Sequence, residues 1–466
     1  MVVPMVASGR WAWAMLTVVG CAVGLRRLWL RLVRVTAERR VGRRLSLCTA
    51  ALLIIVMGLS GVVGWADTSV LSGVPEYEWF HGCGVTSAGM MMGYWDGQPG
   101  YGNLFTYDGG DASTQWGNTD GSTGVYHMIS SKEHNDSTFN QDNCTHTNAS
   151  NCLGCFTHTD PVVGGTYYAD LPVGLRLYAD WDDPTTGADE SYDFIADYSI
   201  LYHPDWDPAE EPGCFTFEFL KTEIDQGRPL LLGASLDGAG HGVVAYGYQD
   251  NPGTDDDWYA VRDTWVDGDS DGVYGVTAKV EDSTEWWLWE TPQSGDVFGE
   301  RYYISQATYF YPNPGGSVSD AGSNDSFGTA QPISSTEIVI GAVDSPADQD
   351  WYSFFLNAGD CLTATTSTDY SVLSTSTVDT RLYLYNPDGT LRVSNDNFYT
   401  DSLMPHLWWE AEIAGDWRLK VDGVDSSTGS YYLSMINQPI PEPGTLLLFA
   451  TALPAIAIGL RRRRRC

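Results

Sequence analysis

Short apolar runs alternate with turn-rich polar segments along the middle of the chain. Two stretches have a helical pattern: residues 82–95, rich in small and apolar side chains, and residues 216–226, which carry one apolar face and end at Gly227. Four shorter apolar runs predict strands at 230–236, 243–246, 259–261 and 302–304. The pattern therefore predicts an antiparallel sheet with the first helix packed on it.

The pattern changes after a Pro/Gly-rich segment. Residues 312–323 read as a linker, and beyond them short alternating strands are separated by turns such as Pro387-Asp388-Gly389, with no helical period. This arrangement predicts a β-sandwich over residues 324–436. The preceding domain is expected to span 67–311.

Both ends of the chain have the pattern of targeting segments. Residues 1–66 contain nine arginines and then the apolar run 45–63, which is typical of a secretory leader. An earlier apolar stretch at 11–24 leaves two alternatives, a start codon placed too early or a retained anchor. At the other end, an apolar span at 444–460 precedes five consecutive arginines, which indicates a transmembrane segment with its cytoplasmic side at the C-terminus.

The net charge of the chain restricts the kinds of molecule that it can bind. The formal net charge is −35 over 466 residues, and the 14 arginines of the two end segments account for more than half of the 25 basic residues. The body between them is therefore more acidic still, so nucleic acid and anionic lipid are poor partners and divalent cations are good ones.

Three residues have the pattern of a nucleophile, a base and an orienting group. Cys83 stands at the start of the first predicted helix, His241 opens an apolar strand after a glycine-rich loop, and Asp263 ends the next strand. A helix N-terminus and a nearby imidazolium lower the pKa of a thiol, which makes it a nucleophile at neutral pH. We therefore expect a Cys83, His241 and Asp263 triad, with a buried structural cysteine as the alternative.

The segments around these residues resemble a papain-like cysteine peptidase of the bacteriocin-processing type that cleaves double-glycine leaders. The resemblance covers roughly residues 74–311 and implies an α+β papain-like domain, which the β-sandwich then follows. Such enzymes carry a glutamine about six residues before the nucleophile as an oxyanion donor, whereas this chain has Glu76-Tyr77-Glu78-Trp79 there.

The resemblance implies an endopeptidase that hydrolyses a polypeptide substrate and needs no cofactor for catalysis. The missing glutamine keeps open an alternative, a non-catalytic surface or matrix module that retains the fold. Transglutaminase-like acyl transfer uses the same three residue types and also stays open.

Two further resemblances concern the C-terminal half. Residues 320–436 resemble the bacterial pre-peptidase C-terminal domain, and residues 437–466, with Pro441-Glu442-Pro443, resemble the PEP-CTERM sorting signal. An ordinary membrane anchor is the alternative to the latter. Together they imply export from a Gram-negative bacterium through the Sec machinery, recognition by an exosortase, and a final place at the cell surface or outside it, near extracellular polysaccharide.

Two groups of residues have metal-binding or disulfide patterns. Asp267, Asp269 and Asp271 alternate with turn residues, which indicates a calcium loop or a solvated acidic turn, since Ala278 stands where an EF-hand needs glutamate. Four cysteines, Cys144, Cys152, Cys155 and Cys214, are expected to form two disulfides, which leaves Cys83 free. The alternative is a zinc site that adds His146 and His158 to three of them.

Overall fold

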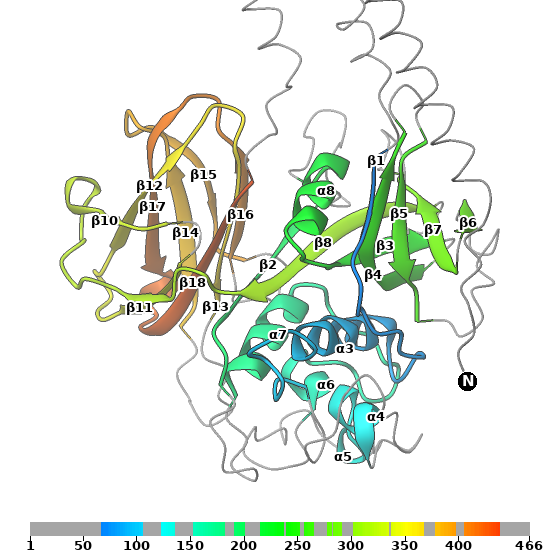
Figure 1. Ribbon diagram of the computed structural model, residues 1–466. Coiled ribbons are helices and arrows are strands. Elements are labelled where there is room, and N and C mark those ends of the chain that lie inside the picture. Colours follow the sequence, from blue (N-terminus) through cyan, green and yellow to red (C-terminus); the bar gives the residue numbers. More distant parts are fainter. Residues whose placement is uncertain are drawn as a thin grey trace, which may run out of the picture. The chain divides into compact units, whose positions relative to one another are not determined.

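A computed structural model provides the architecture of the chain (Figure 1). It describes residues 67–105, 123–135, 152–181, 191–200, 215–236, 239–251, 256–264, 277–281, 283–290, 302–334, 337–367, 378–397 and 405–438. The predicted leader at 1–66, the predicted sorting signal at 437–466 except its first two residues, and the segment with Asp267, Asp269 and Asp271 lie outside these residues.

The first sheet has eight strands. In chain order they are β1 (Asp67–Val70), β2 (Phe194–Ile200), β3 (Leu230–Leu236), β4 (Ala239–Asp250), β5 (Trp258–Arg262), β6 (Ala278–Glu281), β7 (Thr284–Leu288) and β8 (Tyr303–Pro312). The strand order is β2-β8-β3-β4-β5-β7-β6, with β1 paired to the far end of β4, and all of the pairings are antiparallel.

The helices of the described residues are short. They are α3 (Cys83–Asp96), α4 (Gly124–Ile129), α5 (Lys132–Asn135), α6 (Leu153–Phe156), α7 (Asp170–Asp180) and α8 (Phe217–Asp225). Figure 1 shows α3 to α7 gathered together, while α8 lies apart from them and contacts β1 and β4.

The expected fold class, an α+β papain-like domain followed by an all-β sandwich, is wrong. The described residues are mostly strand, 42% against 20% helix, in three sheets, and no papain-like α+β domain is evident. The reason lies in strands such as β8, where Ser305, Gln306 and Thr308 are buried among aromatic residues. Buried polar side chains hide the apolar pattern on which a strand prediction depends.

Helix α3 is held tightly because glycines let its neighbours approach. A Cβ on Gly89 would lie 2.8 Å from Ile129, and one on Gly93 would lie 2.3 Å from the Tyr77 hydroxyl. At its C-terminal end, Trp95 Nε1 donates to the Phe310 carbonyl on β8 at 2.9 Å. The helix is therefore fixed to the sheet along its length, and its first residue, Cys83, is fixed with it.

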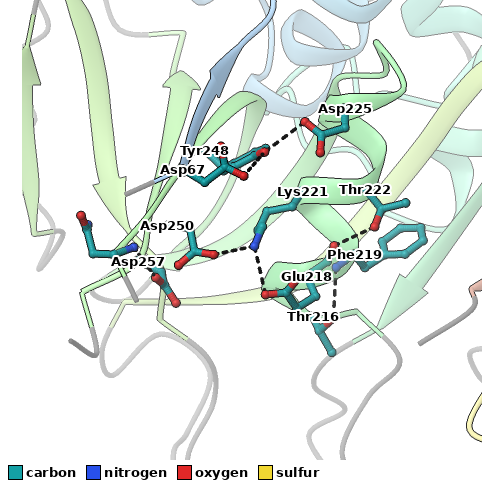
Figure 2. Close-up of polar contacts among 11 residues, drawn as sticks. Asp67, Thr216, Glu218, Phe219, Lys221, Thr222, Asp225, Tyr248, Asp250 and Asp257 are labelled. Atoms are coloured by element: carbon teal, nitrogen blue, oxygen red, sulfur yellow. Dashed lines mark hydrogen bonds and ion pairs between the residues drawn. The ribbon is translucent and has the colours of Figure 1, made fainter. Parts of the chain in front are cut away.

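Helix α8 is joined to β1 and β4 by polar contacts, which Figure 2 shows. Thr216 caps its N-terminus by accepting from the Phe219 backbone N–H at 3.2 Å. The Tyr248 hydroxyl of β4 contacts Asp225 of α8 at 3.0 Å and Asp67 of β1 at 3.3 Å. The first described strand and α8 thus meet on the same strand that carries His241.

The C-terminal half forms two five-stranded sheets. Their strands are β9 (Ser317–Ser319), β10 (Gln331–Pro332), β11 (Ile338–Val343), β12 (Asp350–Leu356), β13 (Cys361–Ser367), β14 (Thr380–Tyr385), β15 (Leu391–Asn395), β16 (His406–Glu410), β17 (Gly415–Gly423) and β18 (Gly429–Gln438). The orders are β10-β12-β17-β14-β15 and β16-β13-β18-β11-β9. Buried residues of both sheets, among them Tyr352, Leu384, Trp417 and Leu433, share one core.

A buried acid links the edge strand β2 to this C-terminal half. Thr365 and Thr363 of β13 donate to the Asp197 carboxylate at 2.9 and 3.3 Å, and His406 Nε2 contacts the Tyr198 carbonyl at 2.8 Å. Burial raises the pKa of Asp197 to about 7, with the two threonines and a backbone N–H opposing it. The contact between β2 and the C-terminal half is therefore partly polar and is made by specific hydrogen bonds.

Candidate functional site

Cys83 opens α3 and is a free, partly exposed thiol. The turn before it is fixed by Thr86, whose hydroxyl donates to the Gly82 carbonyl at 2.7 Å and accepts from the Phe80 backbone N–H at 3.0 Å. No side chain caps α3 within the described residues. The first backbone N–H groups of the helix therefore have no acceptor within the helix and can donate only to groups outside it.

The backbone N–H groups of Gly242, of Gly84 and of Cys83 itself lie near the thiol, and each of them lowers the pKa of the thiol. Burial is the larger effect, and it raises that pKa above its ordinary value. The expectation of a lowered Cys83 pKa is therefore wrong, because desolvation outweighs the helix N-terminus.

The backbone of His241 is brought to the start of α3 because Gly242, which follows it in β4, packs there. A Cβ on Gly242 would lie 3.0 Å from Gly84 Cα and 3.3 Å from the Cys83 carbonyl carbon. The Ser87 hydroxyl donates to the Gly242 carbonyl at 2.9 Å, and the Tyr168 hydroxyl donates to the His241 carbonyl at 3.1 Å. The structure thus brings together the two residues that sequence placed 158 positions apart.

A backbone carbonyl orients the imidazole. His241 Nε2 lies 2.8 Å from the carbonyl oxygen of Asp263, directly after β5. Because a carbonyl only accepts, Nε2 carries the proton, and Nδ1 of the neutral ring is the basic nitrogen. The structure thus brings Asp263 to His241 through its main chain, and a role for the carboxylate itself stays a prediction.

Burial also determines the charge of the imidazole. It lowers the pKa of His241 to about 4, against the opposing effect of the hydrogen bond to Asp263. With the thiol pKa raised and the imidazole pKa lowered, both groups are neutral at pH 7. The pair is then set up for proton transfer during attack rather than for a resting thiolate–imidazolium pair.

The segment that lacks the glutamine is tied to the strand end that carries Asp263. Arg262 pairs with the Glu76 carboxylate at 2.8 Å, and the Trp79 backbone N–H donates to the Thr264 carbonyl at 2.7 Å. The Trp79 side chain is half exposed. Its backbone N–H is therefore engaged elsewhere, and the N–H groups at the start of α3 are the donors nearest to the thiol.

The expected disulfides are wrong for two of the four cysteines. Cys152 and Cys155 are buried and form no disulfide, while Cys361, which was not assigned a partner, is disulfide-bonded. Cys144, Cys214 and His146 lie outside the described residues. His158, the other ligand of the zinc alternative, lies 3.9 Å from Asp170 and is about one-third exposed.

Sequence reasoning missed several residues of this region. Ser87 and Gly242 lie inside the two motifs but act through hydrogen bonds and close packing that no motif expresses. Tyr168 and His134 lie in turn-rich segments with no periodic pattern. Only their proximity in the folded structure identifies them, because their separation from Cys83 along the sequence matches no motif.

The neutral pair leads to a specific expectation for chemical labelling. Alkylation of Cys83 by iodoacetamide should accelerate steadily up to and beyond pH 9, because the reactive thiolate forms only above the ordinary thiol pKa. Mass spectrometry of the Cys83 peptide measures this rate. A rate that is independent of pH between 5 and 8 would contradict it and indicate a resting thiolate.

Within the part of the chain that the structure describes, no helix combines the length and apolar character needed to cross a membrane. The predicted span at 444–460 lies outside that part.

Comparison with known proteins gives only weak likenesses. No family model matches the chain, and no curated protein matches it. Among solved structures, the pre-peptidase C-terminal domain of a Bacillus anthracis collagenase is 15% identical, with 23% of this chain and 93% of that chain covered and a TM-score of 0.19.

Two other solved structures are comparably distant. The periplasmic g-type lysozyme inhibitor PliG of Aeromonas hydrophila is 13% identical, covers 22% of this chain and 84% of its own, and has a TM-score of 0.17. The M60 catalytic domain with two CBM51 domains of Clostridium perfringens ZmpB is 10% identical, covers 53% and 32%, and has a TM-score of 0.14. Scores this low carry no argument about activity.

Proposed function

We propose that the chain is an exported hydrolase that cleaves peptide bonds with Cys83 as nucleophile and His241 as general base. The observation that carries this proposal is the place of Cys83 at the start of α3, packed against Gly242 of the strand that carries His241, whose Nε2 is held by the Asp263 carbonyl. A buried structural cysteine needs neither the helix start nor the oriented base.

In the proposed reaction, Nδ1 of His241 takes the thiol proton as Sγ attacks the peptide carbonyl carbon. The tetrahedral intermediate then expels the amine, which receives that proton from the imidazolium, and a thioester to Cys83 remains. Water, deprotonated by His241, attacks the thioester and releases the acid and the free thiol. The cycle needs no metal ion or organic cofactor.

The oxyanion is expected to form at the N-terminus of α3. The first backbone N–H groups of α3, those of Cys83 and Gly84, lie near the thiol and lower its pKa. They lie outside the helix's own hydrogen-bond ladder and can donate to the oxyanion that develops during attack. This replaces the side-chain amide that Glu76-Tyr77-Glu78-Trp79 does not supply.

Export is part of the proposal. The leader at 1–66 and the sorting signal at 437–466 would take the chain through the Sec machinery to an exosortase, transiently anchored by the span 444–460, and then to the cell surface or beyond. The acidic body disfavours nucleic acid and suits a polypeptide substrate in a cation-rich exterior near extracellular polysaccharide.

A second candidate function is a non-catalytic surface or matrix-binding protein. It is favoured by one observation, the raised pKa of Cys83 beside the lowered pKa of His241, which are both consequences of burial. Burial of this degree would suit a site that has lost access to substrate. The two functions make opposite predictions for covalent trapping.

The deciding experiment treats the full-length chain with a peptide carrying a C-terminal vinyl sulfone and, separately, with an unfolded polypeptide. We expect a stoichiometric adduct on the Cys83 peptide and cleavage products, both lost in Cys83→Ala and retained in Ser345→Ala, a control on an exposed serine of the C-terminal half. Absence of adduct and cleavage in a folded chain would support the binding module, and amide products with added amines would indicate acyl transfer.

A further inference from the structure

Three ligand-type side chains converge away from Cys83 and His241. His134 comes from α5, Cys152 immediately precedes α6, and Cys155 lies within α6. The ligand atoms of all three lie within 4.8 Å of one another, and all three residues are buried. Among the described residues, no other such group of histidine, cysteine and carboxylate side chains is present.

The separations match those around a tetrahedral metal ion. Cys152 Sγ and Cys155 Sγ are 3.5 Å apart, as are Cys155 Sγ and His134 Nδ1. With metal–sulfur and metal–nitrogen bonds of about 2.3 and 2.0–2.1 Å, tetrahedral zinc would separate two sulfurs by about 3.8 Å and a sulfur and nitrogen by about 3.6 Å. A disulfide would need sulfurs at about 2.05 Å.

The surrounding hydrogen bonds prepare these atoms as ligands. His134 Nε2 lies 2.9 Å from the Thr159 carbonyl oxygen, which only accepts. Nε2 therefore carries the proton, and the lone pair is on Nδ1, the atom that faces Cys155. A histidine that donates its second N–H to a backbone carbonyl is the usual arrangement in metal sites.

The cysteine side is prepared in the same way. The Ser131 backbone N–H lies near Cys152 Sγ and lowers the pKa of that thiol, and the Ser131 hydroxyl accepts from the His134 backbone N–H at 3.2 Å. Ser131 thus positions one ligand from each of the two segments. Such N–H donors stabilise a metal-bound thiolate, which is the form of cysteine that binds zinc.

We propose that His134, Cys152 and Cys155 supply three of the four ligands of a zinc ion. Two sulfurs and one imidazole are a donor set for zinc, while calcium and magnesium require oxygen ligands. This inference is independent of the proposed hydrolysis, because no step of that reaction uses these three residues. The zinc site considered from the sequence used His158, whereas the site proposed here uses His134 in its place.

The ion would fix the segment that supports the nucleophile. Thr159, the acceptor for His134, joins Thr157 at 2.9 Å and Thr166 at 2.7 Å through hydroxyl contacts. A Cβ on Gly84 would lie 3.5 Å from the Thr166 Cβ, so this hydroxyl chain ends against the first turn of α3. Loss of the ion is therefore expected to loosen that turn as well as α6.

The test measures metal and thiols in the full-length chain, purified without chelator or reductant. We expect about one zinc per chain by elemental analysis, and exchange with cobalt should give visible ligand-field bands and a sulfur-to-cobalt charge-transfer band typical of tetrahedral thiolate coordination. A chelator should lower the thermal midpoint of the same sample. These measurements on the unaltered chain need no variant to fold.

Variants assign the ligands. Cys155→Ser and His134→Ala should lose the zinc and the cobalt spectrum, and His158→Ala, the matched control on an exposed histidine of the same segment, should keep both. A chain that holds no zinc and shows a Cys152–Cys155 disulfide by mass would overturn the proposal. Zinc retained unchanged in folded Cys155→Ser would also overturn it, because the ion would then be bound elsewhere.

Discussion

Replacing His241 by alanine should lower the rate of peptide hydrolysis by about 100- to 10,000-fold at pH 7, the contribution usual for a general base. The loss is large because the thiol is neutral there and needs a base during attack. The unaltered protein should hold a constant kcat/KM from about pH 5 to 8 and lose activity as His241 becomes protonated near pH 4. Initial rates across pH 3 to 9 measure both effects.

Asp263→Asn is the matched control for the orienting group. The atom that holds His241 is the Asp263 backbone carbonyl, which this substitution leaves in place, so kcat/KM should change by less than about threefold. A loss as large as that of His241→Ala would contradict this and assign the orienting role to the carboxylate.

Gly82→Ala should be the most destabilising single substitution near the site. The Gly82 φ is 139°, and an added Cβ would lie 2.2 Å from the Gly164 carbonyl oxygen, so both the backbone conformation and the space exclude a side chain. Strain and overpacking each cost about 1–3 kcal/mol, and we expect a total loss of about 3–5 kcal/mol in the free energy of unfolding. Urea denaturation at constant m-value measures it.

Gly100→Ala separates the two causes. Gly100 has a φ of 100°, but an added Cβ there would meet nothing within 4 Å, so only the backbone strain remains. We expect a loss of about 1–2 kcal/mol for this control. Equal losses for the two variants would mean that the contact with Gly164 does not matter, and that the 152–166 segment does not support the start of α3.

Local elements were predictable from the sequence. The helix expected at 82–95 is α3, Cys83–Asp96, and the helix expected at 216–226 is α8, Phe217–Asp225, because small-residue and amphipathic patterns with clear end signals depend on near neighbours alone. The motif around His241 predicted a strand there, although β4 begins two residues earlier, at Ala239, and runs on to Asp250. The proximity of His241 to Cys83 follows from that strand and α3 together.

The fold class and the electrostatics were not predictable in this way. Strand pairing joins residues far apart in sequence, such as Gly233 with Gln306, and a buried glutamine gives no strand signal. The pKa of Cys83 depends on how much solvent the packed helix excludes, which no motif encodes. His134 was missed because a long turn-rich interval separates it in sequence from its partners, Cys152 and Cys155.

The first described strand limits how the leader can be trimmed. Residues 67–70 pair with residues 247–250 of β4, the strand that begins beside Cys83 and carries His241. A signal peptidase that cut after residue 70 would remove this strand and expose the backbone donors and acceptors of β4 that it covers. Cleavage at the predicted boundary after residue 66 would leave the strand whole. The predicted processing site therefore lies directly before the residues that complete this edge of the sheet.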